Sequence, residues 1–359
     1  MVLPAAAEPL RVATWHVEMQ RRGPGLLLRD ILAGEDPDVA AVVDVIAHVS
    51  PDILLLTGFD WDLKLAAARA LETRLATAGA GYPHLFALPS NAGLATGLDM
   101  DGDGRTGGPR DAQGYGWFAG QGAMVLLSRL PIDSAKVQDF SDLLWAYLAW
   151  GRPPMVNGQP FPSPQAQAAL RLSSTGHWDV PVILPDGGRL HLLCFAATTP
   201  VFDGPEDANG LRNHDEIALW SVYLDGGLGP PPEDAVVVLG NANLDPSDGE
   251  GRQTAIRDLI GHARLQDPRP RSAGGTKAAV VHGGANTGQA GDAALDTADW
   301  SDDPGPGNLR VSYVLPDRAL AVTDAGVFWP VAGDPLRPLV EGEGLPRHRL
   351  VWVDLDVPG

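Results

Sequence analysis

The sequence predicts an α+β fold in which two mixed β-sheets pack against each other and carry helices on their outer faces. Along the chain, short apolar runs typical of buried strands alternate with amphipathic segments typical of helices. In the middle of the chain, two strand-like segments are separated only by the turn sequence Pro-Asp-Gly-Gly, which predicts an antiparallel pair. Interleaved strands and helices with antiparallel pairs favour two packed sheets with helices outside.

The predicted helices follow from capping residues and apolar spacing. Asp36 and Pro37 suit the N-cap and the first position of a helix, and apolar residues recur after them at helical spacing. Pro51 ends this helix, because proline cannot continue it. The predicted helices are residues 36–49, 63–78, 213–224 and 251–262.

Strands are predicted where apolar or alternating runs end at glycine or polar residues. The clearest run is AVVVLGNANLDP, residues 235–246, in which four β-branched or apolar residues lead to Gly240, Asn241 and Asn243. Such a strand presents short polar side chains to a pocket at its end. The predicted strands are residues 10–17, 52–56, 123–128, 172–184, 189–197, 235–240, 309–315, 319–329 and 350–355.

We expect one domain, residues 10–356, that carries two long loops. Residues 91–122 are rich in Gly and Asp, have no periodic pattern, and are too long for a simple connector, which indicates a functional or ion-stiffened loop. Residues 271–307 are rich in Gly, Ala and Asp and are expected to form an exposed, mobile loop.

The charge balance restricts the class of partner. The chain has 26 Lys and Arg against 45 Asp and Glu, a formal net charge of −19. This charge disfavours duplex nucleic acid as a partner but leaves open a small phosphorylated or sugar ligand. No segment approaches the length of a membrane span. Residues 1–10 lack the pattern of a signal peptide. The cellular compartment is not determined, because the missing signal-peptide pattern is compatible with an exported mature chain and with a trimmed chain.

Five segments in fixed order resemble the motifs of a known family: RVATWHVE, PDILLLTGFD, GNANLDP, RVSYVLP and RHRLVWVDL. Together they resemble the endonuclease/exonuclease/phosphatase superfamily, which has the fold of pancreatic deoxyribonuclease. The resemblance extends from Arg11 to Asp354 and implies a four-layer α/β/β/α sandwich. It also implies cleavage of phosphoester bonds with a divalent metal, usually magnesium, at the sheet edges.

Most positions that the resemblance would make catalytic are substituted. Of these positions, only Asn243 and His348 keep the family's residue. At the others, this sequence has His16 where the family has Asn, Gly58 where it has the metal-binding Glu, Ala196 where it has His, Asn241 where it has the water-activating Asp, and Ser312 and Arg347 where it has Asp. An amide cannot take a proton from water at neutral pH, and glycine offers no oxygen to a metal. The sequence therefore predicts a degenerate family member, with weak or no phosphoesterase activity and a binding role.

An active hydrolase with rearranged ligands is the alternative. Asp60 lies two residues after Gly58 and Glu18 two after His16, and an offset of two keeps a strand side chain on the same face. These carboxylates could hold magnesium or manganese. The acid–base or ligand candidates are then His16, His177, Asn241, Asn243 and His348. Whether the chain is an enzyme stays open at this point.

Asp99, Asp101 and Asp103, followed by Gly104, match the opening of a calcium loop. Position twelve of that pattern is Arg instead of Glu, and the adjacent Asp111 is the candidate replacement. We expect structural calcium in loop 99–111. A third hypothesis is an extracytoplasmic, calcium-stabilised protein that binds a sugar or a cell-surface ligand through aromatic loops.

His214 and Asp215 lie near the start of the helix predicted at 213–224. Acidic residues near a helix N-terminus are stabilised by the helix dipole, which would explain them without a function. Alternatively, both side chains lie at the mouth of the pocket and bind the ligand.

Overall fold

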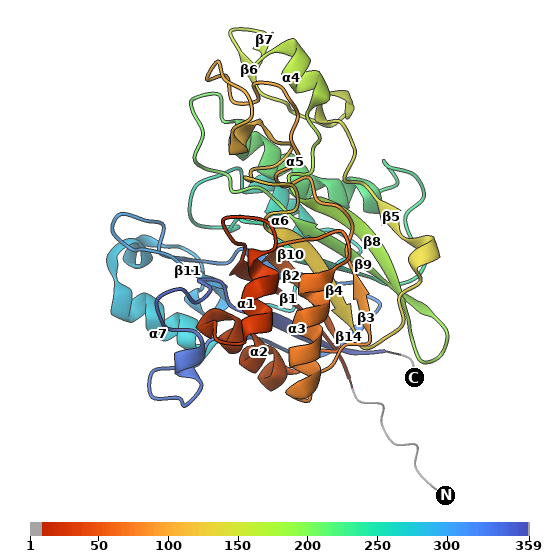
Figure 1. Ribbon diagram of the computed structural model, residues 1–359, viewed down its shortest axis with the longest axis vertical. Coiled ribbons are helices and arrows are strands. Elements are labelled where there is room, and N and C mark those ends of the chain that lie inside the picture. The colour runs from red at the N-terminus through yellow and green to blue at the C-terminus, as the bar shows by residue number, and fades with distance from the viewer. Residues whose placement is uncertain (1–8, 358–359) are drawn as a thin grey trace, which may run out of the picture.

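A computed structural model describes residues 9–357, and two large mixed sheets form its centre (Figure 1). The first sheet has the strand order β14-β15-β1-β2-β4-β3, and the second has the order β13-β10-β9-β8-β5. The pairs β1–β2 and β9–β10 are parallel, and the other pairs are antiparallel. Residues 1–8, most of the segment considered above for a signal peptide, lie outside the described residues.

The first sheet contains β1 (Leu10–Met19), β2 (Ile53–Phe59), β3 (His84–Phe86), β4 (Ala123–Ser128), β14 (Ala321–Val327) and β15 (Val351–Asp356). The second contains β5 (Gln138–Asp139), β8 (Gly176–Ile183), β9 (Arg189–Ala196), β10 (Val236–Asn241) and β13 (Ser312–Pro316). Two small hairpins are β6 (Met155–Val156) with β7 (Gln159–Pro160), and β11 (Ala298–Asp299) with β12 (Asn308–Leu309). The helices are α1 (Leu26–Ala33), α2 (Pro37–Val49), α3 (Ala66–Thr77), α4 (Pro164–Ala169), α5 (Ala208–Leu224), α6 (Thr254–Ile260) and α7 (Ala273–His282).

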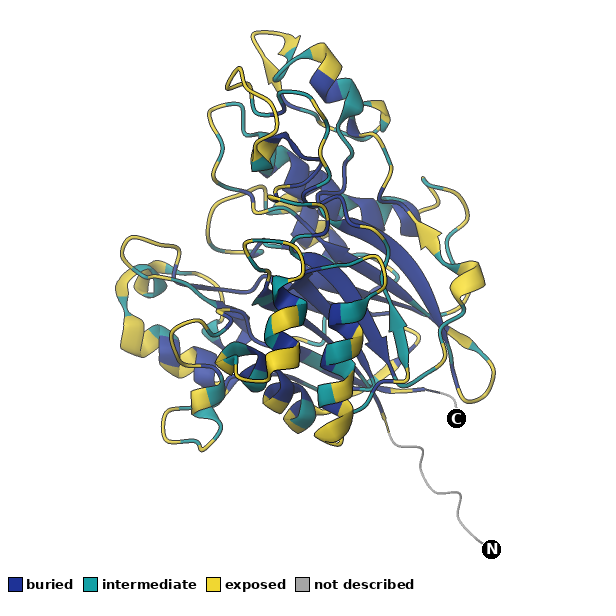
Figure 2. Cartoon of the chain, in the orientation of Figure 1, coloured by how far each residue is buried: buried dark blue, intermediate teal, exposed yellow. Residues whose placement is uncertain are grey.

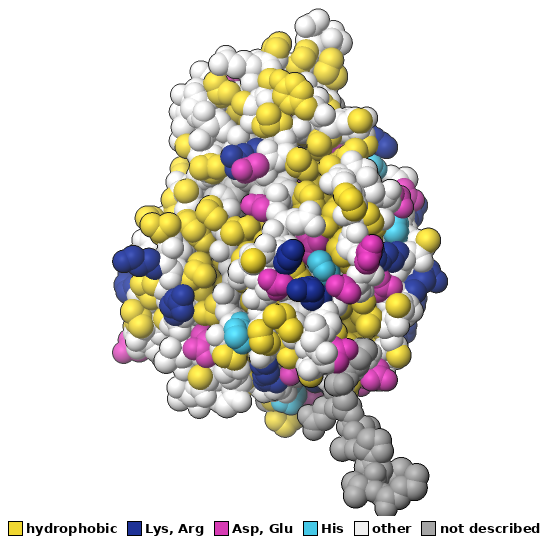
Figure 3. Space-filling model, turned by 90° about the vertical axis from the view of Figure 1, so that its right-hand side faces the viewer, with side chains coloured by type: hydrophobic (Ala, Val, Ile, Leu, Met, Phe, Trp, Pro, Cys, Tyr) yellow, Lys and Arg dark blue, Asp and Glu magenta, His cyan; other side chains and the backbone are white. Residues whose placement is uncertain are grey.

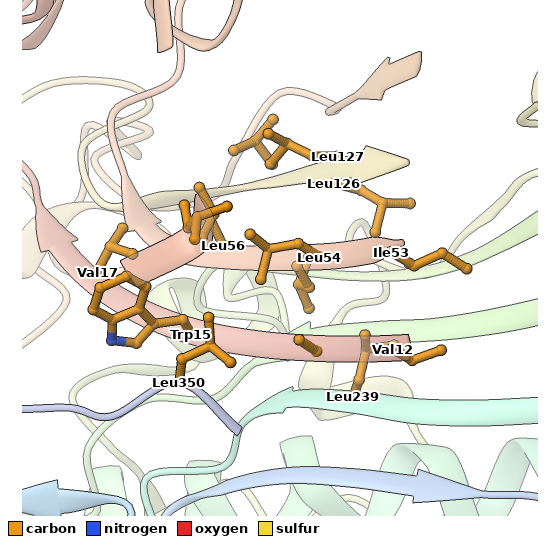
Figure 4. Close-up of a cluster of buried hydrophobic side chains, with 14 of the residues drawn as sticks. Val12, Trp15, Val17, Ile53, Leu54, Leu56, Leu126, Leu127, Leu239 and Leu350 are labelled. Carbon is orange, nitrogen blue, oxygen red and sulfur yellow. The ribbon is translucent and has the colours of Figure 1, made fainter. Parts of the chain in front are cut away.

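The sheets and helices form the predicted four-layer sandwich. Helices α1, α2 and α3 cover the first sheet, and α5 and α6 pack against the second (Figures 1 and 2). Side chains of β1 and β2 lie near Leu239 of β10 between the two sheets (Figure 4). The two sheets are therefore joined by an apolar core, and their central strands are buried, whereas β14 and β5 at the edges are largely exposed (Figure 2).

Two sequence expectations differ from the structure. Residues 271–307 were expected to be a loop, but they contain α7, which Ser272 caps by accepting the N–H of Gly275 at 3.0 Å. A Cβ at Gly274 would lie 2.0 Å from the carbonyl oxygen of Trp329, so the helix backbone packs too closely for a side chain there. This glycine lowers the helix signal for a reason that only tertiary packing reveals.

The helix expected to begin at residue 213 begins at Ala208. Asn213 to Glu216 therefore lie in its second turn and are buried, so the N-cap interpretation of this segment is wrong. Within residues 9–357, no helix combines the length and apolar character needed to cross a membrane.

Candidate functional site

Strand ends from both sheets meet at one edge of the sandwich. In the second sheet, Ala196, Asn241 and Ser312 are register neighbours on β9, β10 and β13. Thr297 links this edge to the next segment, because its Oγ1 accepts the N–H of Ser312 at 3.0 Å. His348 lies beside this segment, because it forms an isolated β-bridge with Ala298. The residues carried over from the family motifs are therefore gathered here by non-local pairing.

Two imidazoles from distant parts of the chain lie together at this edge. The ring centroids of His16 and His348 are 4.5 Å apart, and Trp300 stands edge-on to His348 at 5.2 Å. His16 Nδ1 is 2.9 Å from Thr57 Oγ1. Burial lowers the pKa of His16 to about 4 and lowers the pKa of His348 well below its usual value. Both rings are therefore uncharged at neutral pH.

The imidazole of His16 lies close to Gly58 and occupies the space that a side chain at position 58 would need. Gly58 has φ +70°, and a Cβ built on it would lie 2.8 Å from Cε1 of His16. A side chain at position 58 would thus meet both an unfavourable backbone conformation and the imidazole. The family's metal-binding Glu cannot stand at this position while His16 keeps its place.

The two asparagines of the central motif hold each other. Asn241 Nδ2 donates to Asn243 Oδ1 at 3.2 Å, and the backbone N–H of Asn243 donates to Asn241 Oδ1 at 3.2 Å. Asn243 Nδ2 also donates to the carbonyl oxygen of Ala197 at 2.8 Å. Both amides therefore orient the strand end, and neither offers a basic atom to water.

The two carboxylates suggested as replacement ligands are occupied by backbone donors. Asp60 accepts the N–H of Arg21 at 2.9 Å and the N–H of Gly122 at 3.0 Å. Glu18 accepts the N–H of Arg347. Burial raises the pKa of both carboxyl groups. Of the residues that the structure describes, Asp99, Asp101 and Asp103 are the one set of three or more His, Cys, Asp or Glu close enough to share an ion.

Several buried polar atoms along this edge have no hydrogen-bond partner within residues 9–357. They are Oγ of Ser312, Nδ1 of His348, the side-chain amide of Asn308 and Oδ2 of Asp296. A buried polar group without a partner is costly, and such groups are rare in folded proteins. Thr57, Thr297 and Asn308 are not evident as site residues from the sequence. Thr57 lies in a motif segment but is not one of the positions to which the resemblance gives a role, and Thr297 and Asn308 lie outside the motif segments.

His177 lies on β8 but faces the helix layer. It pairs in register with Phe195, whose ring belongs to the outer core beneath α5. Its Nε2 lies 2.9 Å from the carbonyl oxygen of Glu216, and its Nδ1 contacts Ser173 Oγ. Burial lowers its pKa to about 4. The structure thus places His177 on the sheet face opposite to that of Ala196, since residue 195 and residue 196 point to opposite sides.

His214 and Asp215 lie together, but away from the imidazole pair, on a groove beside α5 and α6. Their side chains are joined by a 2.9 Å contact between His214 Nδ1 and Asp215 Oδ1.

The acidic loop brings its first three aspartates together. The carboxylate oxygens of Asp99, Asp101 and Asp103 lie within 4.8 Å of one another, so this cluster could hold a metal ion. Asp99 also accepts the N–H groups of Gly102 and Gly104, at 2.7 and 2.9 Å. Asp111 stands apart from this cluster in its contacts: it accepts backbone N–H groups of Met100 and Gly108, at 3.0 and 2.8 Å.

Comparison with known proteins agrees with this architecture. The sequence model of the Endonuclease/Exonuclease/phosphatase family matches residues 14–338. An endonuclease/exonuclease/phosphatase from Beutenbergia cavernae DSM 12333 is similar in structure, with a TM-score of 0.56, 16% identity, and coverage of 98% of this chain and 72% of that one. A family protein from Leptotrichia buccalis C-1013-b gives a TM-score of 0.51 at 12% identity, covering 96% and 99%. No curated protein matches by sequence. The chain belongs to the endonuclease/exonuclease/phosphatase family.

Proposed function

We propose that this protein is a degenerate family member that binds a small ligand at the sheet edge and does not hydrolyse phosphoesters. One observation carries the proposal: the place of the metal-binding Glu is Gly58, and the neighbouring imidazole of His16 fills the space that a side chain there would need. A hard cation such as magnesium is bound through oxygen ligands. The motif positions at the edge supply two neutral imidazoles and two amides that are hydrogen-bonded to each other, and this set of motif residues does not suit magnesium.

The unpartnered polar atoms of Ser312, Asn308 and His348 support a binding role, because a bound molecule with hydrogen-bonding groups would satisfy them. The net charge of −19 supports a small phosphorylated or sugar ligand over duplex nucleic acid. On the face shown in Figure 3, basic side chains lie in small groups among acidic ones, which also disfavours a polyanion.

The first test is a phosphoesterase assay with magnesium or manganese on p-nitrophenyl phosphate and bis(p-nitrophenyl) phosphate. We expect the wild-type rate to equal the rate without protein. Asn241→Asp alone should not raise it, because a base without a metal ligand cannot assemble the reaction. Turnover that disappears in His348→Ala would overturn the proposal and establish the rearranged-ligand hydrolase. Circular dichroism of each variant confirms that it is folded.

We further propose that the cluster of Asp99, Asp101 and Asp103 binds calcium and stiffens the long loop. Calcium prefers several carboxylate oxygens in a flexible turn, and Gly102 and Gly104 provide that turn at φ +79° and +81°. An ion present at about 100 times its Kd would add about 2.7 kcal/mol to the free energy of unfolding. The melting temperature should therefore rise with calcium and fall with a chelator.

The matched variant is Asp101→Asn with Asp103→Asn, because Asp99 also holds the turn through Gly102 and Gly104 and is left intact. Calorimetry should show calcium binding to the wild type and none to the double variant. A chelator that leaves the melting temperature of the wild type unchanged would refute this site. Magnesium binding that survives in the variant would instead place a cation at the sheet edge.

A further inference from the structure

A second cavity lies apart from the sheet edge, on the outer side of the second sheet. It is a groove of about 470 Å³ between α5, α6 and the segment 150–152, a size typical of sites for small molecules. Its polar and aromatic lining includes Trp150, Arg152, His214, Asp215, Ser221, Asp225, Thr254 and Asp258. Neither the family motifs nor the proposed function uses this groove.

A fixed histidine faces the groove. Asp215 is fully buried, and its carboxylate accepts Trp145 Nε1 at 2.7 Å, the N–H of Arg152 at 2.5 Å and His214 Nδ1 at 2.9 Å. The carboxylate can only accept, so Nδ1 of His214 carries the proton. This leaves Nε2 as an acceptor at the groove, 3.5 Å from Nη1 of Arg152. The guanidinium of Arg152, a donor, and Nε2 of His214, an acceptor whose tautomer Asp215 fixes, therefore lie side by side.

The rest of the lining selects for a neutral ligand. Ser221 Oγ is buried and has no partner within the described chain, so it can bond to a ligand hydroxyl. Asp225 and Asp258 add two carboxylates against the single guanidinium of Arg152, which disfavours an anion. Trp150 offers an aromatic surface for the apolar face of a ring.

We propose that this groove binds a neutral, polyhydroxylated ring of monosaccharide size. In this arrangement His214 Nε2 accepts a hydrogen bond from one hydroxyl, Arg152 donates a hydrogen bond to another oxygen, and the sugar ring packs on Trp150. The carboxylates of Asp225 and Asp258 accept hydrogen bonds from further hydroxyls. This site does not depend on the proposed function, because it shares no residue with the sheet edge.

Saturation-transfer NMR tests the proposal with methyl α-D-mannopyranoside, methyl β-D-galactopyranoside, methyl α-D-glucopyranoside and, separately, inorganic phosphate. We expect at least one glycoside to bind and phosphate not to bind. Trp150→Ala should weaken that binding by about tenfold, because the variant loses both the stacking contact of the indole with the sugar ring and the apolar area that this contact buries. His214→Ala should weaken it as well. Leu32→Ala, at an exposed apolar residue of α1 that belongs to neither site, is the matched control and should leave the affinity unchanged.

Binding of none of the three glycosides would overturn the proposal, as would affinity that is unchanged in Trp150→Ala. Phosphate binding that is lost in the groove variants would assign the groove to an anion instead. Trp150 is only partly buried, so its variant carries the test even if His214→Ala does not fold. Phosphoester turnover by the wild type would contradict the proposed function and leave this inference intact, so the two failures are distinguishable.

Discussion

Replacing Glu216 with alanine is expected to lower the free energy of unfolding by about 3–5 kcal/mol, the usual cost of removing one partner from a buried charged network. Glu216 is fully buried on α5. Its carboxylate accepts the N–H and Oγ of Ser174, at 2.6 and 2.7 Å, and the N–H of Thr198 at 2.6 Å. Alanine would leave these donors buried without acceptors, and each such group is costly.

The neighbouring Arg212 increases this effect. Its guanidinium is buried and donates to four carbonyl oxygens, those of Gln113, Arg171, Leu172 and Ser173, so it cannot move to water when its counter-charge is removed. Urea unfolding followed by circular dichroism measures the change. Glu250→Ala, at an exposed acidic residue, is the control and should stay within about 0.5 kcal/mol of wild type. Equal unfolding midpoints for Glu216→Ala and wild type would contradict this account.

Asp296→Asn is expected to stabilise the protein at alkaline pH. Burial, reinforced by the charges of Asp245, Asp248 and Asp292, raises the pKa of Asp296 to about 8. In the unfolded chain this carboxyl titrates near its ordinary value of about 3.9. Between these two values the folded state holds a proton that the unfolded state lacks. The free energy of unfolding therefore falls as pH rises through this window, and the loss is complete above the folded pKa.

An asparagine cannot ionise, so the variant escapes this loss. We expect a gain of about 2–4 kcal/mol in the free energy of unfolding at pH 9 and little change at pH 4, since one pKa unit corresponds to about 1.4 kcal/mol. Thermal unfolding of both proteins across this pH range measures it. Asp303→Asn, at an exposed carboxylate in the same segment, should follow the wild-type curve. If the difference in free energy of unfolding between the wild type and Asp296→Asn stays the same from pH 5 to pH 9, the raised pKa of Asp296 is refuted.

Many individual strands and helices could be predicted because their signals are local, whereas the four-layer arrangement was implied by the resemblance to the family. The buried runs at β2 and β10, and the Asp36–Pro37 start of α2, are visible in the sequence and appear in the structure, where Asp36 accepts the N–H groups of Asp38 and Val39. Helix α7 was missed because Gly274 is required by the close approach of Trp329, a contact far away in sequence.

Site residues could be predicted only where they lie in the segments that resemble the family motifs. His16 and His348 were singled out, and their pairing follows from strands at the two ends of the chain meeting in one sheet. The helix-facing direction of His177 depends on register with Phe195, which a single sequence does not reveal. The structural role of Glu216 depends on Ser174 and Thr198, two loop residues that tertiary packing brings to α5.

The contact between Gly58 and His16 also constrains how this chain arose from an ancestor with the family motifs. An imidazole at position 16 and a side chain at position 58 exclude each other in this backbone, so the two replacements are not independent events. Once the imidazole was in place, a single change back to glutamate would meet both the ring and a left-handed backbone. Restoring a glutamate at position 58 therefore requires a second change at position 16 as well as a different backbone conformation.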